Sequence, residues 1–188
     1  MRRDEGSGRR IAGASVTLRA PELSDYQEWA SLREESRAHL QPWEPTWAPD
    51  EHSRGAYRYR LRRYAEDIRD DKAYPFFMFR NEDDALVGGL TLSNIRRGVS
   101  QMASLGYWTG ARFAGKGYMT AGVQGLVAFA FSDLGLHRVE AACQPENAAS
   151  RAVLLKAGFE HEGAAKGYLR INGAWRDHLL FGIVHPNG

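Results

Sequence analysis

The stretch Arg112-Phe113-Ala114-Gly115-Lys116-Gly117 lies between a predicted strand, residues 103–109, and a long predicted helix that begins at Tyr118. Its pattern is Arg-x-x-Gly-x-Gly. Glycines at such a turn leave backbone N–H groups uncovered and can adopt positive φ. The positive end of the following helix dipole points at the same place. The sequence therefore predicts an anion site suited to a pyrophosphate.

Hydrophobic periodicity and turn signals extend this unit in both directions. Gly122 and Gly125 lie inside the long helix, where each costs about 1 kcal/mol relative to alanine, so we expect close packing on the sheet there. The proline-rich stretch 40–50 fits no regular element. Taken in order, the elements predict a mixed α/β sheet in a three-layer arrangement. Strands are expected at 16–21, 74–80, 85–94, 103–109, 137–144, 160–170 and 174–184, and helices at 24–37, 57–68, 118–135 and 147–158.

Composition indicates a soluble globular protein with one domain over residues 13–188. Hydrophobic residues make up 43% and charged residues 26% of the 188 residues. No apolar run approaches the roughly 20 residues of a membrane helix. The net charge of +2 argues against a broad nucleic-acid surface.

The ends and the single cysteine bear on localisation. Residues 1–12 are charged and lack an apolar signal region, so we expect a disordered leader and no secretory signal. Cys143 stands in an apolar strand, excludes an internal disulfide and is typical of a buried structural thiol. These features favour a cytoplasmic protein. The sequence leaves the oligomeric state open between monomer and homodimer.

Three ligands compete for the glycine turn. The spacing Gly110-x-x-x-x-Gly115-Lys116 opens like a Walker loop, but Gly117 replaces the hydroxyl residue that holds the metal. A dinucleotide fingerprint requires a third glycine where Thr120 stands. The pyrophosphate of coenzyme A needs only backbone donors. The six histidines show no metal spacing, so no metal site is expected, and none of the six is expected to be catalytic.

From about residue 16 to 184 the chain resembles the Gcn5-related N-acetyltransferases (GNAT). The resemblance rests on SLGYWTG (104–110), the glycine turn, the long helix and HRVEAACQPENAASRAVLLKAGF (137–159). LQPWEP (40–45) and the pair Asn147-x-x-Ser150 resemble the RimJ/RimL branch, whose members acetylate N-terminal amines of ribosomal proteins. The resemblance implies two central strands that splay apart, acetyl-CoA bound in the gap between them, and helices on both faces of the sheet.

The resemblance also implies which residues contact acetyl-CoA. The pantetheine arm lies along a strand, the pyrophosphate lies in the glycine turn, and a helix start lies near the sulfur. In that order these residues are Tyr107, Trp108 and Thr109, then Arg112, Ala114, Gly115, Lys116, Gly117 and Tyr118, and finally Asn147 and Ser150.

Stabilising the departing thiolate falls to Ser150 by this resemblance. Many relatives place a tyrosine four residues before the glycine of the Gly158-Phe159 pair, where this chain has Leu154. A serine hydroxyl is a weak acid, so hydrogen-bond donation or proton relay is expected of it. From spacing alone, Asn147 and Ser150 are equally typical of a helix cap, and both roles are compatible.

The general base is left open. RimL-like members place a glutamate where this chain has Leu169. Glu44 lies between two prolines, and Trp43 and Trp47 beside it would wall an apolar pocket that raises the carboxylate pKa. Glu44 would then act as a base or bind the acceptor's ammonium group; the alternative is a structural loop. Glu140 is a further candidate, whose alternative is an ion-paired strand carboxylate.

These patterns predict an acetyl-CoA-dependent N-acetyltransferase that transfers directly, because no activated Cys or Ser–His pair is evident. The expected acceptor is the N-terminal alanine α-amine of a ribosomal protein, bound near Trp43, Glu44 and Trp47. A small amine, such as an antibiotic, a polyamine or an amino acid, is the alternative acceptor. Outside this class, a non-catalytic acyl-CoA sensor and a nucleotide-binding switch remain.

Overall fold

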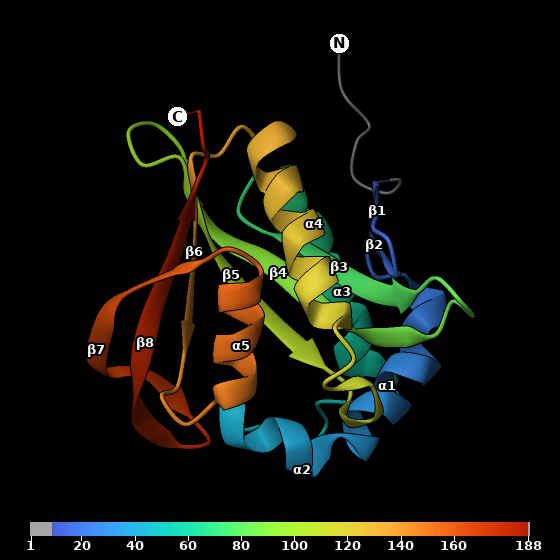
Figure 1. The fold of residues 1–188 in the computed structure, drawn as a ribbon. Helices are drawn as coiled ribbons and strands as arrows, with labels where there is room; N and C mark the ends of the chain where they lie inside the picture. Colours follow the sequence, from blue (N-terminus) through green and yellow to red (C-terminus); the bar gives the residue numbers. More distant parts are fainter. Residues whose placement is uncertain (1–8, 188) are drawn as a thin grey trace.

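A computed structural model describes residues 9–187, and Figure 1 shows its ribbon. Its strands are β1 (Arg10–Ala12), β2 (Val16–Arg19), β3 (Tyr74–Arg80), β4 (Leu86–Arg96), β5 (Met102–Thr109), β6 (Arg138–Cys143), β7 (Glu160–Ile171) and β8 (Ala174–Val184). Its α-helices are α1 (Tyr26–Glu35), α2 (Arg37–Leu40), α3 (Arg54–Arg69), α4 (Tyr118–Ser132) and α5 (Ala148–Lys156), and short 3-10 turns are η1 (Leu23–Asp25), η2 (Gln41–Trp43) and η3 (Ala111–Phe113). No helix in this described part is long and apolar enough to cross a membrane.

The strands form one mixed sheet in the order β1-β2-β3-β4-β5-β6-β8-β7. Every neighbouring pair is antiparallel except β5 and β6, which are parallel. Helices α4 and α5 cover one face, while α1 and α3 pack on the other (Figure 1). The predicted mixed α/β architecture with helices on both faces is confirmed.

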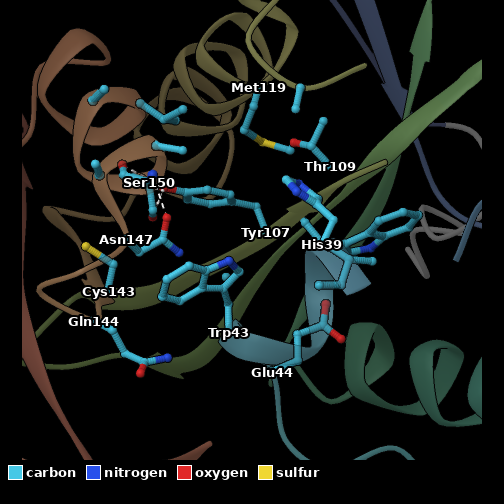
Figure 2. Close-up of a pocket in the computed structure, with 18 of the residues that line it drawn as sticks. His39, Trp43, Glu44, Tyr107, Thr109, Met119, Cys143, Gln144, Asn147 and Ser150 are labelled. Carbon is cyan, nitrogen blue, oxygen red and sulfur yellow. Dashed lines mark hydrogen bonds between the residues drawn. The ribbon is translucent and has the colours of Figure 1, made fainter. Parts of the chain in front are cut away.

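The central strands β5 and β6 part within the sheet. Their pairing runs only from Met102–Arg138 to Leu105–Ala141. On its other edge, β5 stays paired with β4 as far as Thr109. Beyond Leu105 the side chain of Tyr107 reaches across the gap toward α5 (Figure 2). This is the splay that the family resemblance implies.

Two local predictions are wrong. Residues Arg10–Ala12 are not a disordered leader, because they pair with β2 and Ile11 packs against the core; residues 1–8 of the predicted leader lie outside the described residues. The α-helix expected to start at Ser24 starts at Tyr26, because Ser24 lies inside the 3-10 turn η1. In that turn the Asp25 carboxylate accepts from the Glu22 amide at 2.7 Å and pairs with Arg19 from β2. The ion pair thus fastens the start of this helical segment to β2.

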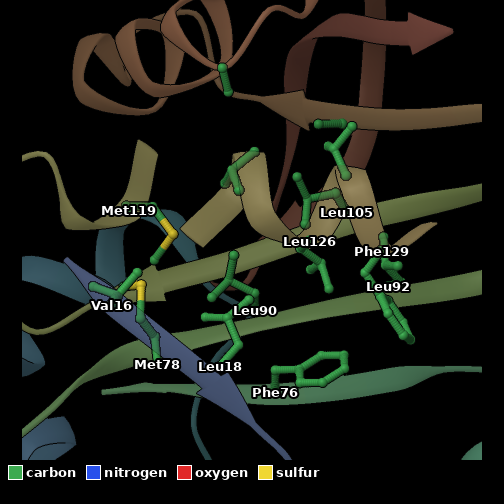
Figure 3. Close-up of a cluster of buried hydrophobic side chains, with 14 of the residues drawn as sticks. Val16, Leu18, Phe76, Met78, Leu90, Leu92, Leu105, Met119, Leu126 and Phe129 are labelled. Carbon is green, nitrogen blue, oxygen red and sulfur yellow. The ribbon is translucent and has the colours of Figure 1, made fainter. Parts of the chain in front are cut away.

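The core under α4 is built from side chains of the helix and of the sheet beneath it (Figure 3). Met119 and Leu126 of α4 face Met78 and Leu90. A Cβ added to Gly122 would lie 2.6 Å from the Met78 sulfur, which is closer than van der Waals contact allows. The expected close packing at this glycine is confirmed, and it offsets the helix-propensity cost.

Glycine also sets the spacing of β4 and β5. A Cβ at Gly88 would collide with the backbone carbonyl of Trp108, which cannot rotate away, whereas a Cβ at Gly106 would meet nothing within 4 Å. We expect Gly88→Ala to lower the free energy of unfolding by about 1–3 kcal/mol, as overpacking does. Gly106→Ala is the matched control, with no loss expected. Urea unfolding measures both, and equal effects would contradict this account of the strand pair.

Candidate active site between the parted strands

A cavity of about 710 Å³ opens where β5 and β6 separate. Residues from β5, β6, η2 and the first turns of α4 and α5 line it (Figure 2). This volume is typical of a small-molecule or cofactor site. The cavity thus connects the glycine turn, at the start of α4, with the loop around Glu44.

The glycine turn has the geometry that its sequence predicts. Gly115 and Gly117 adopt φ values of 74° and 83°. Gly117 precedes the first turn of α4, and no side chain caps this helix start. A Cβ at either glycine would meet nothing within 4 Å. Open space therefore lies beside amides at the positive end of a helix, where an anion is stabilised.

Most of the predicted acetyl-CoA residues line this cavity. Two predicted pyrophosphate ligands do not: Arg112 pairs with Glu35 at 3.4 Å, and it lies with Lys116 near the Phe113 ring. The backbone, more than these two cations, thus faces the cavity at the turn. The predicted residues that do line it are Tyr107, Trp108, Thr109, Ala114, Gly115, Gly117, Tyr118, Asn147 and Ser150.

Ser150 both belongs to the cap of α5 and faces the gap. Its backbone N–H donates to Asn147 Oδ1 at 3.0 Å, so the predicted cap is confirmed. Its Oγ lies 2.7 Å from the hydroxyl of Tyr107 (Figure 2). Burial raises the pKa of Tyr107, so this phenol stays protonated at neutral pH and can donate. The pair therefore places protonated hydroxyls beside the gap between β5 and β6.

Cys143 lines the same cavity at the end of β6. It is buried, and burial raises the pKa of its thiol. The thiol is the form present at neutral pH, and a thiol is a poor nucleophile. This burial agrees with the structural thiol that the sequence predicts at Cys143.

Glu44 lies in the cavity wall but not in the predicted apolar pocket. Arg33 donates to both of its carboxylate oxygens, at 2.8 and 2.6 Å, and Trp47 Nε1 donates to Oε2 at 2.7 Å. The Arg33 guanidinium lies over the rings of Trp47 and Trp108, at 4.6 and 4.9 Å from their centroids. The carboxylate is therefore a fixed acceptor held by three N–H donors. The sequence reasoning missed Arg33, whose role depends on residues outside its own helix.

The other predicted site residues divide between the cavity and its surroundings. Trp43 lines the cavity, whereas Trp47 does not line it and contacts Glu44 through its Nε1–H bond to the carboxylate. Glu140 does not line it; its carboxylate accepts from Arg138 Nε at 3.0 Å on the partly exposed side of β6. The ion-paired alternative for Glu140 is therefore what the structure shows, and a catalytic role finds no support in its position.

Long-range contacts bring further residues to the end of the cavity around Glu44, which we call the Glu44 end or acceptor end. Gln144 Nε2 donates to the Pro42 carbonyl at 3.1 Å, and the Asn172 amide donates to the Glu44 carbonyl at 2.9 Å. These bonds hold the proline-rich loop against β6 and the β7–β8 hairpin. No local sequence signal marks four further residues of the cavity lining, His39, Gln144, Ile171 and His178. Leu169, which stands where RimL-like members place a glutamate, also lines the cavity.

Within residues 9–187 no group of three or more His, Cys, Asp and Glu side chains is arranged to hold a metal ion. The polar groups that line the cavity are instead backbone amides, hydroxyls and single side chains. Such donors suit a phosphate-bearing organic ligand.

The acetyltransferase (GNAT) domain model matches residues 15–160, so the chain belongs to this family of acetyltransferases. It is 37% identical over 177 residues to the Bacillus subtilis (strain 168) protein "Probable N-acetyltransferase YjcK", covering 94% of this chain and 98% of that one. It is 32% identical over 167 residues to the Escherichia coli (strain K12) [ribosomal protein uS5]-alanine N-acetyltransferase, covering 88% and 86%. Mycobacterium smegmatis RimJ, solved with CoA-disulfide, superposes with a TM-score of 0.87 at 36% identity over 95% of this chain and 86% of that one.

Arg33 and Glu44 form a pair whose side chains are 9% and 20% exposed, so removing the cation leaves a largely buried carboxylate. We expect Arg33→Ala to lower the free energy of unfolding by about 3 kcal/mol, the low end for a broken buried pair because Glu44 keeps some contact with water. Guanidinium unfolding is the measurement. Arg37→Ala removes an exposed pair with Glu34 that water screens, so its effect should be much smaller. An Arg33 variant as stable as the Arg37 variant would contradict the anchoring role.

Proposed function

We propose that this N-acetyltransferase moves the acetyl group of acetyl-CoA to the α-amine of a protein N-terminus, with an alanine-led ribosomal protein as the acceptor. The observation that carries the proposal is the fixed carboxylate of Glu44 beside Trp43 in the cavity wall. A carboxylate has about four acceptor sites, and Arg33 and Trp47 fill three of them, so one remains for an N–H of the acceptor amine. The neighbouring aromatic suits a small apolar first residue. Similarity to the uS5-alanine enzyme supports the same choice. A ribosomal acceptor implies a cytoplasmic site of action.

The cavity offers a place for the pyrophosphate of acetyl-CoA and a place for its pantetheine arm. The uncapped amides at the start of α4 would hold the pyrophosphate, since Gly115 and Gly117 leave that space open. The edge of β5 that faces β6 is unpaired beyond Leu105 and would bond the pantetheine amides through its backbone. Tyr107, Trp108 and Thr109 supply that edge. The CoA-disulfide in the Mycobacterium smegmatis relative supports this ligand class.

Acetyl transfer then needs a neutral amine and a stabilised thiolate. A terminal α-amine has a pKa near 8, so roughly a tenth is neutral at pH 7, far more than for a lysine side chain. Holding both substrates in one cavity supplies much of the barrier reduction. The amine nitrogen attacks the thioester carbon, and the carbon–sulfur bond breaks. One hydroxyl hydrogen joins Ser150 and Tyr107, whose oxygens lie 2.7 Å apart, and the other is free to donate to the sulfur as it becomes negative.

The proposed acceptor is tested with labelled acetyl-CoA and matched peptides. One peptide begins with a free alanine α-amine; a second has the same sequence, an Nα-acetyl group and an internal lysine; a polyamine and an aminoglycoside complete the panel. We expect label on the first peptide only. Label on the small amines alone would show that the acceptor is a small amine and not a protein N-terminus. Acetyl-CoA binding without transfer to any amine would favour a sensor.

Removing the thiolate donors should slow chemistry without weakening acetyl-CoA binding. A hydrogen bond to a charged group contributes about 1.5–3 kcal/mol, so Ser150→Ala and Tyr107→Phe should each lower kcat about 10- to 100-fold. The two losses should be less than additive, because the hydroxyls act as a pair. Ser132→Ala, on the exposed end of α4, is the control that keeps full activity. Steady-state rates and calorimetric Kd values decide; unchanged kcat in both variants would remove the pair from the mechanism.

A further inference from the structure

We propose that His178, on β8, accepts the proton that the acceptor amine loses during acetyl transfer. The inference requires transfer to an amine but not a particular acceptor. Neither carboxylate candidate from the sequence is free for this task, since Glu44 is held by Arg33 and Glu140 lies outside the cavity. His178 lines the cavity, although its side chain is only 3% exposed.

The hydrogen bonding of the ring assigns its tautomer. Nδ1 lies 3.0 Å from the backbone carbonyl oxygen of Arg176. A carbonyl oxygen only accepts, so Nδ1 carries the hydrogen and, in the neutral ring, Nε2 carries the lone pair. Contact with the Tyr168 ring, at 5.7 Å between centroids, helps to hold this orientation. The ring is therefore arranged with its accepting nitrogen away from the strand.

That nitrogen is open to the cavity. Among residues 9–187, no group bonds Nε2 of His178. Nε2 is also absent from the polar side-chain atoms of residues 9–187 that are both shielded from solvent and without a hydrogen-bond partner. An atom without a partner that is not in this group must be accessible. Since the residue as a whole is almost fully buried and lines the cavity, the accessible atom faces that space.

The strand register places His178 at the acceptor end. On β8, Leu180 pairs with Ala142 of β6, so His178, two residues earlier, lies on the same face and next to the level of Gln144. The Gln144 side chain bonds the Pro42 carbonyl of the loop that carries Glu44. His178 is thus on the side of the sheet where the fixed carboxylate lies.

The other titratable groups of the cavity are poor proton acceptors by position or chemistry. His39, Glu146 and Lys156 are exposed residues of its lining, and Tyr118 is a half-buried phenol at the start of α4. Burial raises the pKa of Tyr107 and of Cys143, so both stay protonated at neutral pH. His178, by contrast, is buried in the cavity wall, and no described group occupies the lone pair on its Nε2.

In the proposed step, the neutral amine attacks the thioester carbon, and the nitrogen becomes positively charged. One N–H bond of that nitrogen breaks, and its proton passes to His178 Nε2. The carbon–sulfur bond breaks, and the sulfur keeps the electron pair while a hydroxyl of the Ser150–Tyr107 pair donates a hydrogen bond to the thiolate. Solvent then removes the proton from His178 and protonates the thiolate, which leaves an amide and a free thiol.

His178→Gln should lower kcat about 100-fold, at the low end for general base catalysis because an α-amine is partly neutral already. The assay uses acetyl-CoA with the alanine-led peptide or, if that peptide is inert, whichever amine of the panel takes label. The Kd for acetyl-CoA should not change. His161→Gln is the matched control: this histidine lies on β7 against Phe181, outside the cavity, and kcat should stay at the wild-type value.

Two readouts separate catalysis from a structural role. In His178→Ala, added imidazole should restore part of kcat, whereas a variant that is merely misfolded would show no rescue. In the wild-type protein, ¹⁵N-detected NMR of the imidazole, assigned through its contact with Tyr168, should show hydrogen on Nδ1. Unchanged kcat in His178→Gln, or hydrogen on Nε2 in the neutral ring, would overturn the proposal. An inert alanine-led peptide with an active small amine would refute only the proposed acceptor.

Discussion

The structure depends on the point where β5 and β6 cease to pair, at Leu105 and Ala141. A continuous sheet has no room between its strands, because neighbouring backbones lie about 4.8 Å apart. Here the outer edges stay paired, β5 with β4 and β6 with β8, so the two halves of the sheet remain rigid while their shared edge opens. The opening exposes strand backbone that a ligand can satisfy.

Two helix starts and two hydroxyls surround this opening. The first turns of α4 and α5 both line the cavity, so two positive helix ends act on one place. The open turn at Gly117 leaves the amides of α4 available, whereas Asn147 occupies one amide of α5 and positions Ser150. Tyr107 spans the gap to reach that serine. One helix start is therefore suited to bind an anion, and the other to place a hydroxyl beside a departing sulfur.

The acceptor end is organised by a buried cation. Arg33 lies between two tryptophan rings and holds Glu44, so the cation connects α1 to the proline-rich loop and, through Trp108, to β5. The same loop is fastened by bonds to Gln144 and Asn172 from the far half of the sheet. Both halves of the sheet thus contribute to this wall, and the side chains in it keep fixed positions relative to the gap. That rigidity is what proximity catalysis requires.

The sequence by itself determined the features that depend on neighbours a few residues apart. The glycine turn before α4, the Asn147 cap and the helical stripe around Gly122 all follow from local φ preferences and from the 3.6-residue period. Only the tertiary structure decided which groups meet across the cavity. The Tyr107–Ser150 pair spans 43 residues and the Gln144–Pro42 bond 102, and neither separation leaves a periodic signal. Arg33 and Glu44 are only 11 residues apart, yet a bend after α1 had to bring them together. Hydrogen bonds and ion pairs act over a few ångströms, so partners distant in the chain become identifiable only when the fold sets them side by side.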